Sequence, residues 1–189
     1  MPTVVIPFAG AAGKTRLHES PEVRSALASA MLEDVLAACR PVGPVRVVTP
    51  DEGAVTEATD VELVTDPGAG QGAAVAAGLA GIDGPVVVVN ADVPCVVPSD
   101  VRLLAETAPA LVAAADGTTN ALSLPSADRF EPLFGPGSAE RFHARCGAVS
   151  MALPNLADDV DTMEDLVRVQ LRAGPRTLAA LARLQRNVA

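Results

Sequence analysis

The strongest constraint on the fold is a run of four consecutive valines, residues 86–89, set between Pro85 and Asn90. Such a run has no polar alternation, which is typical of a strand covered on both faces in a mostly parallel sheet. Comparable strand patterns, with helical patterns between them, predict a three-layer α/β/α domain with ligands at the carboxyl ends of the strands. The strand patterns lie at residues 3–7, 44–49, 61–65 and 85–90, and the helical ones at 21–39 and 72–79.

The second half of the chain is less regular but continues the same domain. Residues 111–115 and 120–125 have the composition of strands,. Thr162 is placed to cap a helix whose first turn carries Glu164 and Asp165,. With no internal repeat and no linker-like segment, residues 1–189 are predicted to form a single domain.

The acidic balance of the chain excludes several classes of protein. A net charge of −9 and four Phe with no Trp or Tyr argue against nucleic-acid binding,. No apolar stretch approaches the roughly 20 residues that a membrane span needs. The N-terminus lacks a signal-peptide pattern, and the three cysteines (Cys39, Cys95 and Cys146) lack metal-ligand spacing,. We therefore expect a cytoplasmic protein without disulfides that acts on a small ligand.

A glycine-rich loop follows the first predicted strand. Gly10 and Gly13 flank two alanines, and Lys14 and Arg16 come directly after them. Lys14 is the only lysine in the chain, whose other thirteen basic residues are arginines. Backbone N–H groups beside two cations can bind a polyphosphate. The alternative interpretation is a surface loop with two solvated cations.

Two further segments carry acidic side chains. Asp92 follows the valine run, at the edge of the sheet where ligands bind,. Asp158, Asp159 and Asp161 precede the helix that Thr162 caps, and part of this cluster serves that cap,. Asp159 and Asp161 share one face of an extended segment, so with Asp92 they could hold one or two Mg²⁺ ions.

A second anion site is predicted from two turns rich in glycine and hydroxyl groups. The first turn, residues 116–120, contains Thr118 and Thr119. The second, residues 134–138, contains Gly135 and ends at Ser138, which is placed to cap a helix over 139–145,. The alternative is a pair of ordinary turns.

Residues 68–73 also fit the dinucleotide fingerprint G-x-G-x-x-G/A, with Asp92 at a suitable distance to meet a ribose,. This pattern favours an NAD(P)-binding domain. It follows the third predicted strand instead of the first, and it leaves Lys14 and the aspartates without a role. In a nucleotidyltransferase the same loop, with Gln71 and Gly72, would close around the nucleoside. A non-catalytic binding protein of the same fold is a third alternative.

Taken in order, five segments resemble the 2-phospho-L-lactate/phosphoenolpyruvate guanylyltransferases of deazaflavin coenzyme biosynthesis. The likeness covers nearly the whole chain, and the Phe-Gly-Pro-Gly-Ser and Asp-Val-Asp-Thr segments are its most specific parts. The segments are Gly-Lys-Thr-Arg-Leu (13–17), Asn-Ala-Asp-Val-Pro (90–94), Thr-Asn-Ala-Leu (119–122), Phe-Gly-Pro-Gly-Ser-Ala-Glu-Arg-Phe (134–142) and Asp-Val-Asp-Thr-Met-Glu-Asp-Leu (159–166).

The resemblance implies a glycosyltransferase-A-like nucleotidyltransferase that is Mg²⁺-dependent. It would transfer GMP from GTP to the phosphate of phosphoenolpyruvate or 2-phospho-L-lactate and release pyrophosphate. Lys14 and Arg16 would meet the GTP phosphates, and Asp92 and Asp159 would bind the metal. The acceptor's phosphate would lie against Thr119, Gly135 and Ser138.

Two points depart from the family's pattern. Phe8-Ala9 stands where the family usually has Lys-Pro, and Asp116-Gly117-Thr118-Thr119 stands where the family usually reads Gly-Thr-Gly-Thr before Asn. Which cation meets the triphosphate is therefore open, and Thr118 or Asn120 could share the acceptor site. The Arg- and Ala-rich composition is typical of a high-GC bacterium, and in such an organism phosphoenolpyruvate is expected as the acceptor in place of 2-phospho-L-lactate. A nucleotidyltransferase of the molybdopterin or sugar-phosphate type is the alternative, and the oligomeric state, including a homodimer, is open.

Overall fold

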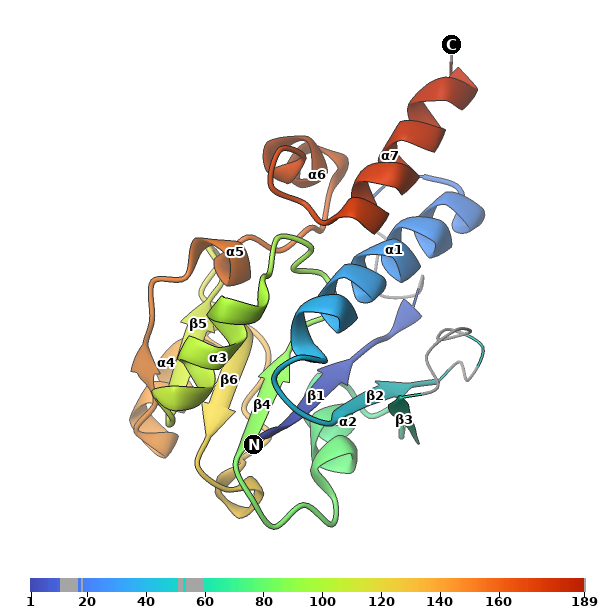
Figure 1. Cartoon of the computed structure of the whole chain (residues 1–189). Helices are drawn as coiled ribbons and strands as arrows, with labels where there is room; N and C mark the ends of the chain where they lie inside the picture. Colours follow the sequence, from blue (N-terminus) through green and yellow to red (C-terminus); the bar gives the residue numbers. More distant parts are fainter. Residues whose placement is uncertain (11–16, 18, 51–52, 54–59, 189) are drawn as a thin grey trace.

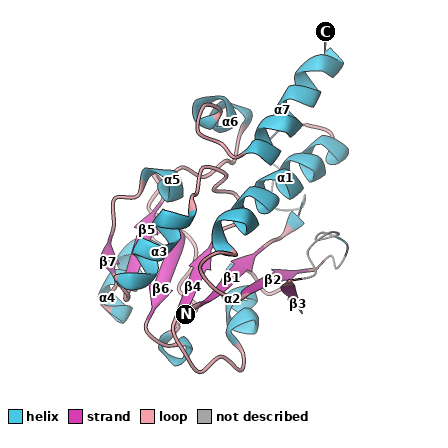
Figure 2. Ribbon diagram, in the orientation of Figure 1, coloured by secondary structure: helices cyan, strands magenta, loops and turns pink. Residues whose placement is uncertain are grey.

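The computed structural model describes residues 1–10, 17, 19–50, 53 and 60–188. These residues form a seven-stranded sheet in the order β3-β2-β1-β4-β6-β5-β7 (Figures 1 and 2). The strands are β1 (Thr3–Pro7), β2 (Val45–Thr49), β3 (Val61–Thr65), β4 (Val86–Val89), β5 (Ala110–Ala113), β6 (Thr119–Leu124) and β7 (Val149–Ser150).

The sheet is mostly parallel, as the sequence predicts. β3, β2, β1 and β4 pair in parallel, and β5 pairs in parallel with β7. β6 is the exception, since it lies between β4 and β5 and runs antiparallel to both. The valine run of β4 is buried along its whole length, which confirms the prediction of a strand covered on both faces.

Two layers of helices cover the sheet. Val4 and Ile6 of β1 pack with α1 (Pro21–Cys39), α3 (Pro98–Glu106) and α5 (Pro154–Ala157) on one face. The intervening Val5 packs with α2 (Gln71–Leu79) and α4 (Ser138–Cys146) on the other face. This alternation is the two-residue period of a strand, and Figure 1 shows the first set of helices in front of the sheet and the second behind it. A short 3₁₀ helix, Ala127–Arg129, precedes the loop that leads to α4.

The C-terminal helices form an addition to these three layers. α6 (Met163–Val169) and α7 (Pro175–Val188) pack on the outer side of α1 around Leu27, Met31 and Leu181 (Figure 1). The buried carboxylate of Asp34, on α1, accepts the backbone N–H groups of Arg176 and Thr177 at 3.0 and 2.8 Å. These bonds satisfy two of the free donors at the start of α7.

The predicted cap of α6 is confirmed. The Thr162 hydroxyl accepts the N–H of Asp165 at 3.2 Å, and the Asp165 carboxylate accepts the N–H of Thr162 at 2.9 Å. The two residues therefore form a reciprocal capping box. No helix of the described residues combines the length and the hydropathy that crossing a membrane requires.

Candidate functional site

A cavity of about 300 Å³ opens between the carboxyl ends of β1 and β4. β1 and β4 are neighbours, but the chain leaves β1 toward β2 and leaves β4 toward β5. The order of strands thus reverses direction between β1 and β4, and such a topological switch point is where ligands bind in open α/β sheets. The walls come from the end of β1, from α1, from the start of α2 and from the segment after β4, and they include Phe8, Gly10, Met31, Gln71 and Asp92.

The start of α2 faces this cavity. Gly70 is its N-cap and has a φ of +88°, a conformation that side chains other than glycine rarely adopt,. Gln71, the first residue of the helix, lines the cavity, and its Nε2 donates to Asn90 Oδ1 at 2.7 Å. Gly72 faces elsewhere, because a Cβ there would lie 3.0 Å from the side chain of Pro132. Its predicted contact with the nucleotide stays a prediction.

Asp92 and the acidic segment before α6 lie side by side. The N–H of Val160 donates to the carbonyl oxygen of Asp92 at 2.9 Å, which brings the residues on either side of Val160 next to Asp92. Burial raises the pKa of Asp159, and the negative charge of Asp92 raises it further. Asp161 lines the cavity together with Asp92. The three predicted carboxylates thus belong to one region.

Among the described residues, no three His, Cys, Asp or Glu side chains converge closely enough to hold a metal ion by themselves. The donor chemistry nevertheless fits Mg²⁺, which prefers carboxylate oxygens and typically takes one or two from a protein beside substrate phosphates. A divalent cation would also offset the repulsion between Asp92 and Asp159 that is visible in the raised pKa,. Binding of Mg²⁺ by these carboxylates stays a prediction.

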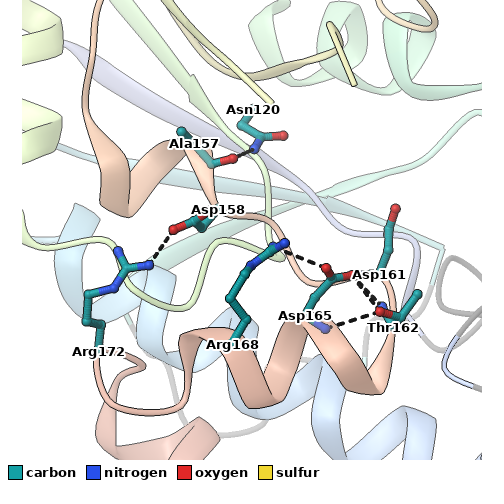
Figure 3. A network of polar contacts seen from close by, with 8 residues as sticks. All are labelled: Asn120, Ala157, Asp158, Asp161, Thr162, Asp165, Arg168 and Arg172. Atoms are coloured by element: carbon teal, nitrogen blue, oxygen red, sulfur yellow. Dashed lines mark hydrogen bonds and ion pairs between the residues drawn. The ribbon is translucent and has the colours of Figure 1, made fainter. Parts of the chain in front are cut away.

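Other acidic residues of the segment serve the structure. The carboxylate of Asp158 forms an ion pair with Arg172 (Figure 3). Burial raises the pKa of Asp165, but hydrogen bonds from Thr162 outweigh it and leave this pKa below its usual range. Arg168 adds an ion pair to Asp165 at 3.1 Å (Figure 3). The cluster therefore combines helix capping and ion pairing with the carboxylates that face Asp92.

The predicted acceptor residues come together, but their hydroxyls are buried. Thr119 Oγ1 and Ser138 Oγ lie 2.9 Å apart in a hydrogen bond, and both residues are almost fully buried. The N–H of Ser138 donates to the carbonyl oxygen of Gly135 at 3.0 Å. The prediction that Ser138 caps the helix is wrong, because α4 begins at Ser138 and its N-cap is Gly137. The Ser138 hydroxyl joins α4 to β6 instead.

Arg141 holds the loop before α4, a role that its sequence position did not suggest. Its Nη2 donates to the carbonyl oxygen of Leu133 at 2.7 Å, and its Nη1 donates to that of Pro136 at 2.6 Å. Gly135 and Gly137 take φ values of +110° and +69° around it. A guanidinium group can serve several carbonyl oxygens at once because its donors form a fixed planar fork.

Several predicted residues cannot be placed. Gly13, Lys14 and Arg16 lie outside the described residues, whereas Gly10 lines the cavity. Other residues of the cavity carried no functional prediction, although Asn90 stands within a motif of the sequence. The aliphatic and aromatic ones have no chemical signal that separates them from core residues. These lining residues include Phe8, Ala28, Met31, Asp66, Ala74 and Asn90.

Residues 23–182 match the model of the MobA-like NTP transferase domain. A curated relative from Streptomyces scabiei (strain 87.22), named phosphoenolpyruvate guanylyltransferase, is 38% identical over 96% of both chains. A relative of the same name from Mycobacterium marinum (strain ATCC BAA-535 / M) is 35% identical over 90% of this chain and 88% of its own.

Solved structures show the same fold at low sequence identity. A structure assigned as a nucleotide-diphospho-sugar transferase from Desulfovibrio desulfuricans G20 superposes with a TM-score of 0.70 at 18% identity, over 97% of this chain and 95% of its own. A nucleotidyl transferase from Methanothermobacter thermautotroptrophicus has a TM-score of 0.61 at 20% identity, over 89% and 95% of the two chains. The glycosyltransferase-A-like architecture expected from the sequence is thus confirmed at the level of the fold.

Proposed function

Because the chain belongs to the family of MobA-like NTP transferases, we propose that it is a guanylyltransferase that transfers GMP from GTP to the phosphate of phosphoenolpyruvate. The observation that carries this proposal is the likeness over 96% of the chain to relatives named phosphoenolpyruvate guanylyltransferase. The cavity between β1 and β4 provides a suitable site, since it joins a glycine loop, the start of a helix and carboxylates. The product would enter deazaflavin coenzyme biosynthesis.

The proposed reaction is an in-line displacement at phosphorus. An oxygen of the acceptor's phosphate attacks the α-phosphorus of GTP, a new P–O bond forms, and the bond to the β-phosphate breaks to release pyrophosphate. The attacking oxygen is already ionised at neutral pH, so no side chain has to remove a proton. The protein's contribution is to hold two anions in line and to stabilise the charge that develops.

Named residues would divide this work. Asp92 and Asp159 would hold Mg²⁺, which when bound supplies charge neutralisation for the phosphates. Lys14 and Arg16 would stabilise the leaving pyrophosphate, and the loop around Gly135 would bind the acceptor. Asp161 lies at the cavity and could complete the metal site.

The cysteines support the proposed cellular setting of the enzyme. Cys39, Cys95 and Cys146 are buried free thiols, as expected in a reducing compartment, and we place the protein in the cytoplasm. Association into a homodimer also stays a proposal, which sedimentation analysis would test.

The test is pyrophosphate release from GTP in the presence of Mg²⁺, with phosphoenolpyruvate, 2-phospho-L-lactate or no acceptor. CTP and ATP are run beside GTP, and EDTA is added to a parallel series. Release that needs GTP, phosphoenolpyruvate and Mg²⁺ is the expected result. Release with another nucleotide or acceptor would keep the chemistry but replace the substrate, whereas no release with any pair would contradict the proposal.

A further inference from the structure

Three side-chain amides from different elements meet beside the cavity. Gln71 begins α2, Asn90 follows β4, and Asn120 lies on β6. Gln71 Nε2 donates to Asn90 Oδ1 at 2.7 Å, and Asn90 Nδ2 lies 3.5 Å from Asn120 Oδ1. The amides therefore connect the start of α2, at the cavity, to the sheet.

Backbone carbonyl groups fix which way each amide faces. Asn120 Nδ2 donates to the carbonyl oxygen of Ala157 at 3.1 Å (Figure 3), and Asn90 Nδ2 donates to that of Thr119 at 3.3 Å. A carbonyl oxygen can only accept, so the nitrogen of each amide must face it. Asn90 then presents Oδ1 to Gln71, and Gln71 must use Nε2 for this bond.

We propose that Asn90 is a positioning residue that orients the amide of Gln71, and that Gln71 thereby selects a nucleotide base with hydrogen-bond donors on its edge. One N–H of Nε2 donates to Asn90 and so fixes the orientation of the amide, and Oε1 is the acceptor that the cavity-lining Gln71 offers to a ligand,. Guanine carries two adjacent donors, N1–H and the 2-amino group, and suits such an acceptor. This inference rests on the proposed function, because it names the feature of GTP that the site reads.

The competing explanation is that the Gln71–Asn90 bond only fastens α2 to the sheet. In that case, removing either side chain would change stability and overall turnover but not the choice of base. The ratio of affinities for GTP and inosine triphosphate (ITP) separates the two explanations, since ITP differs from GTP only by the missing 2-amino group. Changes in folding or in phosphate binding affect both nucleotides alike and cancel in this ratio.

The experiment measures the Kd of GTP and ITP by calorimetry in Mg²⁺ without an acceptor, together with kcat/KM for both nucleotides. We expect wild type to prefer GTP by about tenfold and Gln71→Leu to bring the ratio to about one. Gln71→Glu keeps an acceptor and should keep the preference, although its charge weakens both nucleotides. Asn90→Ala frees the amide to rotate and should lower the ratio to about threefold.

Asn155→Ala is the matched control. Asn155 also binds through its amide, to Asp100 at 3.0 Å and to Arg172 at 3.2 Å, but it does not line the cavity. Its variant should keep the wild-type ratio. Thermal denaturation of every variant identifies any that fail to fold. If Asn90→Ala fails to fold, the comparison of the GTP/ITP ratios of Gln71→Glu and Gln71→Leu still tests the role of Gln71.

The outcomes separate the inference from the proposed function. A wild type without preference for GTP, or a preference that survives in Gln71→Leu, overturns the role of Gln71, even if GTP and phosphoenolpyruvate react normally. A preference that survives in Asn90→Ala overturns the positioning role. A preference that depends on both residues in a protein that transfers nothing to phosphoenolpyruvate supports the inference and contradicts the proposed reaction.

Discussion

At the scale of single residues, Asp159 combines a cost in stability with a proposed role in catalysis. Burial and the charge of Asp92 raise its pKa above the ordinary value. A carboxyl with a raised pKa in the folded state lowers the free energy of unfolding as the pH rises from its unfolded pKa to its folded pKa. The ionised form is therefore destabilising at neutral pH in the absence of metal.

We predict that Asp159→Asn raises the melting temperature at about pH 7 in EDTA, and that this gain disappears below about pH 3, where the wild-type carboxyl is largely protonated in both states. The same variant should lose transferase activity by a factor on the order of 10²–10³. Thermal denaturation across this pH range and pyrophosphate release measure the two effects.

Asp158→Asn is the control for this prediction. Its partner is Arg172, and both side chains are partly exposed, so the change should alter stability by less than about 1 kcal/mol and leave activity close to wild type. A variant Asp159→Asn that melts below wild type at neutral pH would contradict the account of Asp159.

At the scale of elements, the loop before α4 depends on a single guanidinium group. Arg141 donates to the carbonyl oxygens of Leu133 and Pro136, whereas lysine has one nitrogen and cannot reproduce this fork. We predict that Arg141→Lys raises the KM of the acceptor on the order of tenfold, because loosening the loop misplaces the acceptor. The KM of GTP should change by less than about twofold, and steady-state kinetics with each substrate varied in turn measures both.

Arg145→Lys, on the same helix, is the matched control. Its ion pair with Glu131 lies at an exposed surface, so neither KM should change beyond about twofold. An equal rise in both KM values for Arg141→Lys would show that the whole site is disturbed. It would contradict the prediction that Arg141, through the loop before α4, affects the acceptor alone.

The capping box of α6 makes a prediction about pH. Burial raises the pKa of Asp165, but hydrogen bonds from Thr162 and the backbone of Asp161 outweigh it, and the net shift is downward. A lowered pKa gives stability that is present above the unfolded pKa and lost as the pH falls through the folded one. We expect Asp165→Asn to cost about 1 kcal/mol at neutral pH and progressively less below about pH 4.

Urea denaturation at neutral pH and below about pH 4 measures the loss in the free energy of unfolding of Asp165→Asn. Glu164→Gln is the control, since Glu164 is in the same helical turn but exposed. If Glu164→Gln reproduced the loss, the general charge at the start of the helix would explain the effect, and the hydrogen bonds of Asp165 would not.

The sequence predicts these elements unevenly, for physical reasons. The four valines of β4 reveal a strand buried on both faces, and the Thr162–Asp165 spacing reveals a cap, because both signals are local. The antiparallel direction of β6 leaves no such signal, since a strand's apolar pattern is the same in either direction. The hydrogen bond of the Ser138 hydroxyl leaves no local signal either, because its partner is Thr119, nineteen residues earlier.

At the scale of the whole molecule, the C-terminal helices help to fix the acidic segment beside the cavity. The N–H of Gly174 donates to the carbonyl oxygen of Pro94 at 2.8 Å, close to where Val160 bonds to Asp92. Gly174 also lies against Asp34, since a Cβ there would be 2.3 Å from the carboxyl carbon. The attachment of α7 to α1 and the position of the carboxylates are thus parts of one arrangement.

This arrangement depends on both oxygens of Asp34, each of which accepts a backbone N–H of α7. Asn in its place would turn an NH₂ group toward one of these donors and leave a buried N–H unsatisfied. We predict that Asp34→Asn lowers the free energy of unfolding by about 2–4 kcal/mol, measured by urea denaturation. Its neighbour Glu33 forms an exposed ion pair with Arg176 at 3.7 Å, so Glu33→Gln should cost less than about 0.5 kcal/mol. Equal losses in the two variants would mean that charge near α7, and not the buried pair of hydrogen bonds, holds the C-terminal helices on the domain.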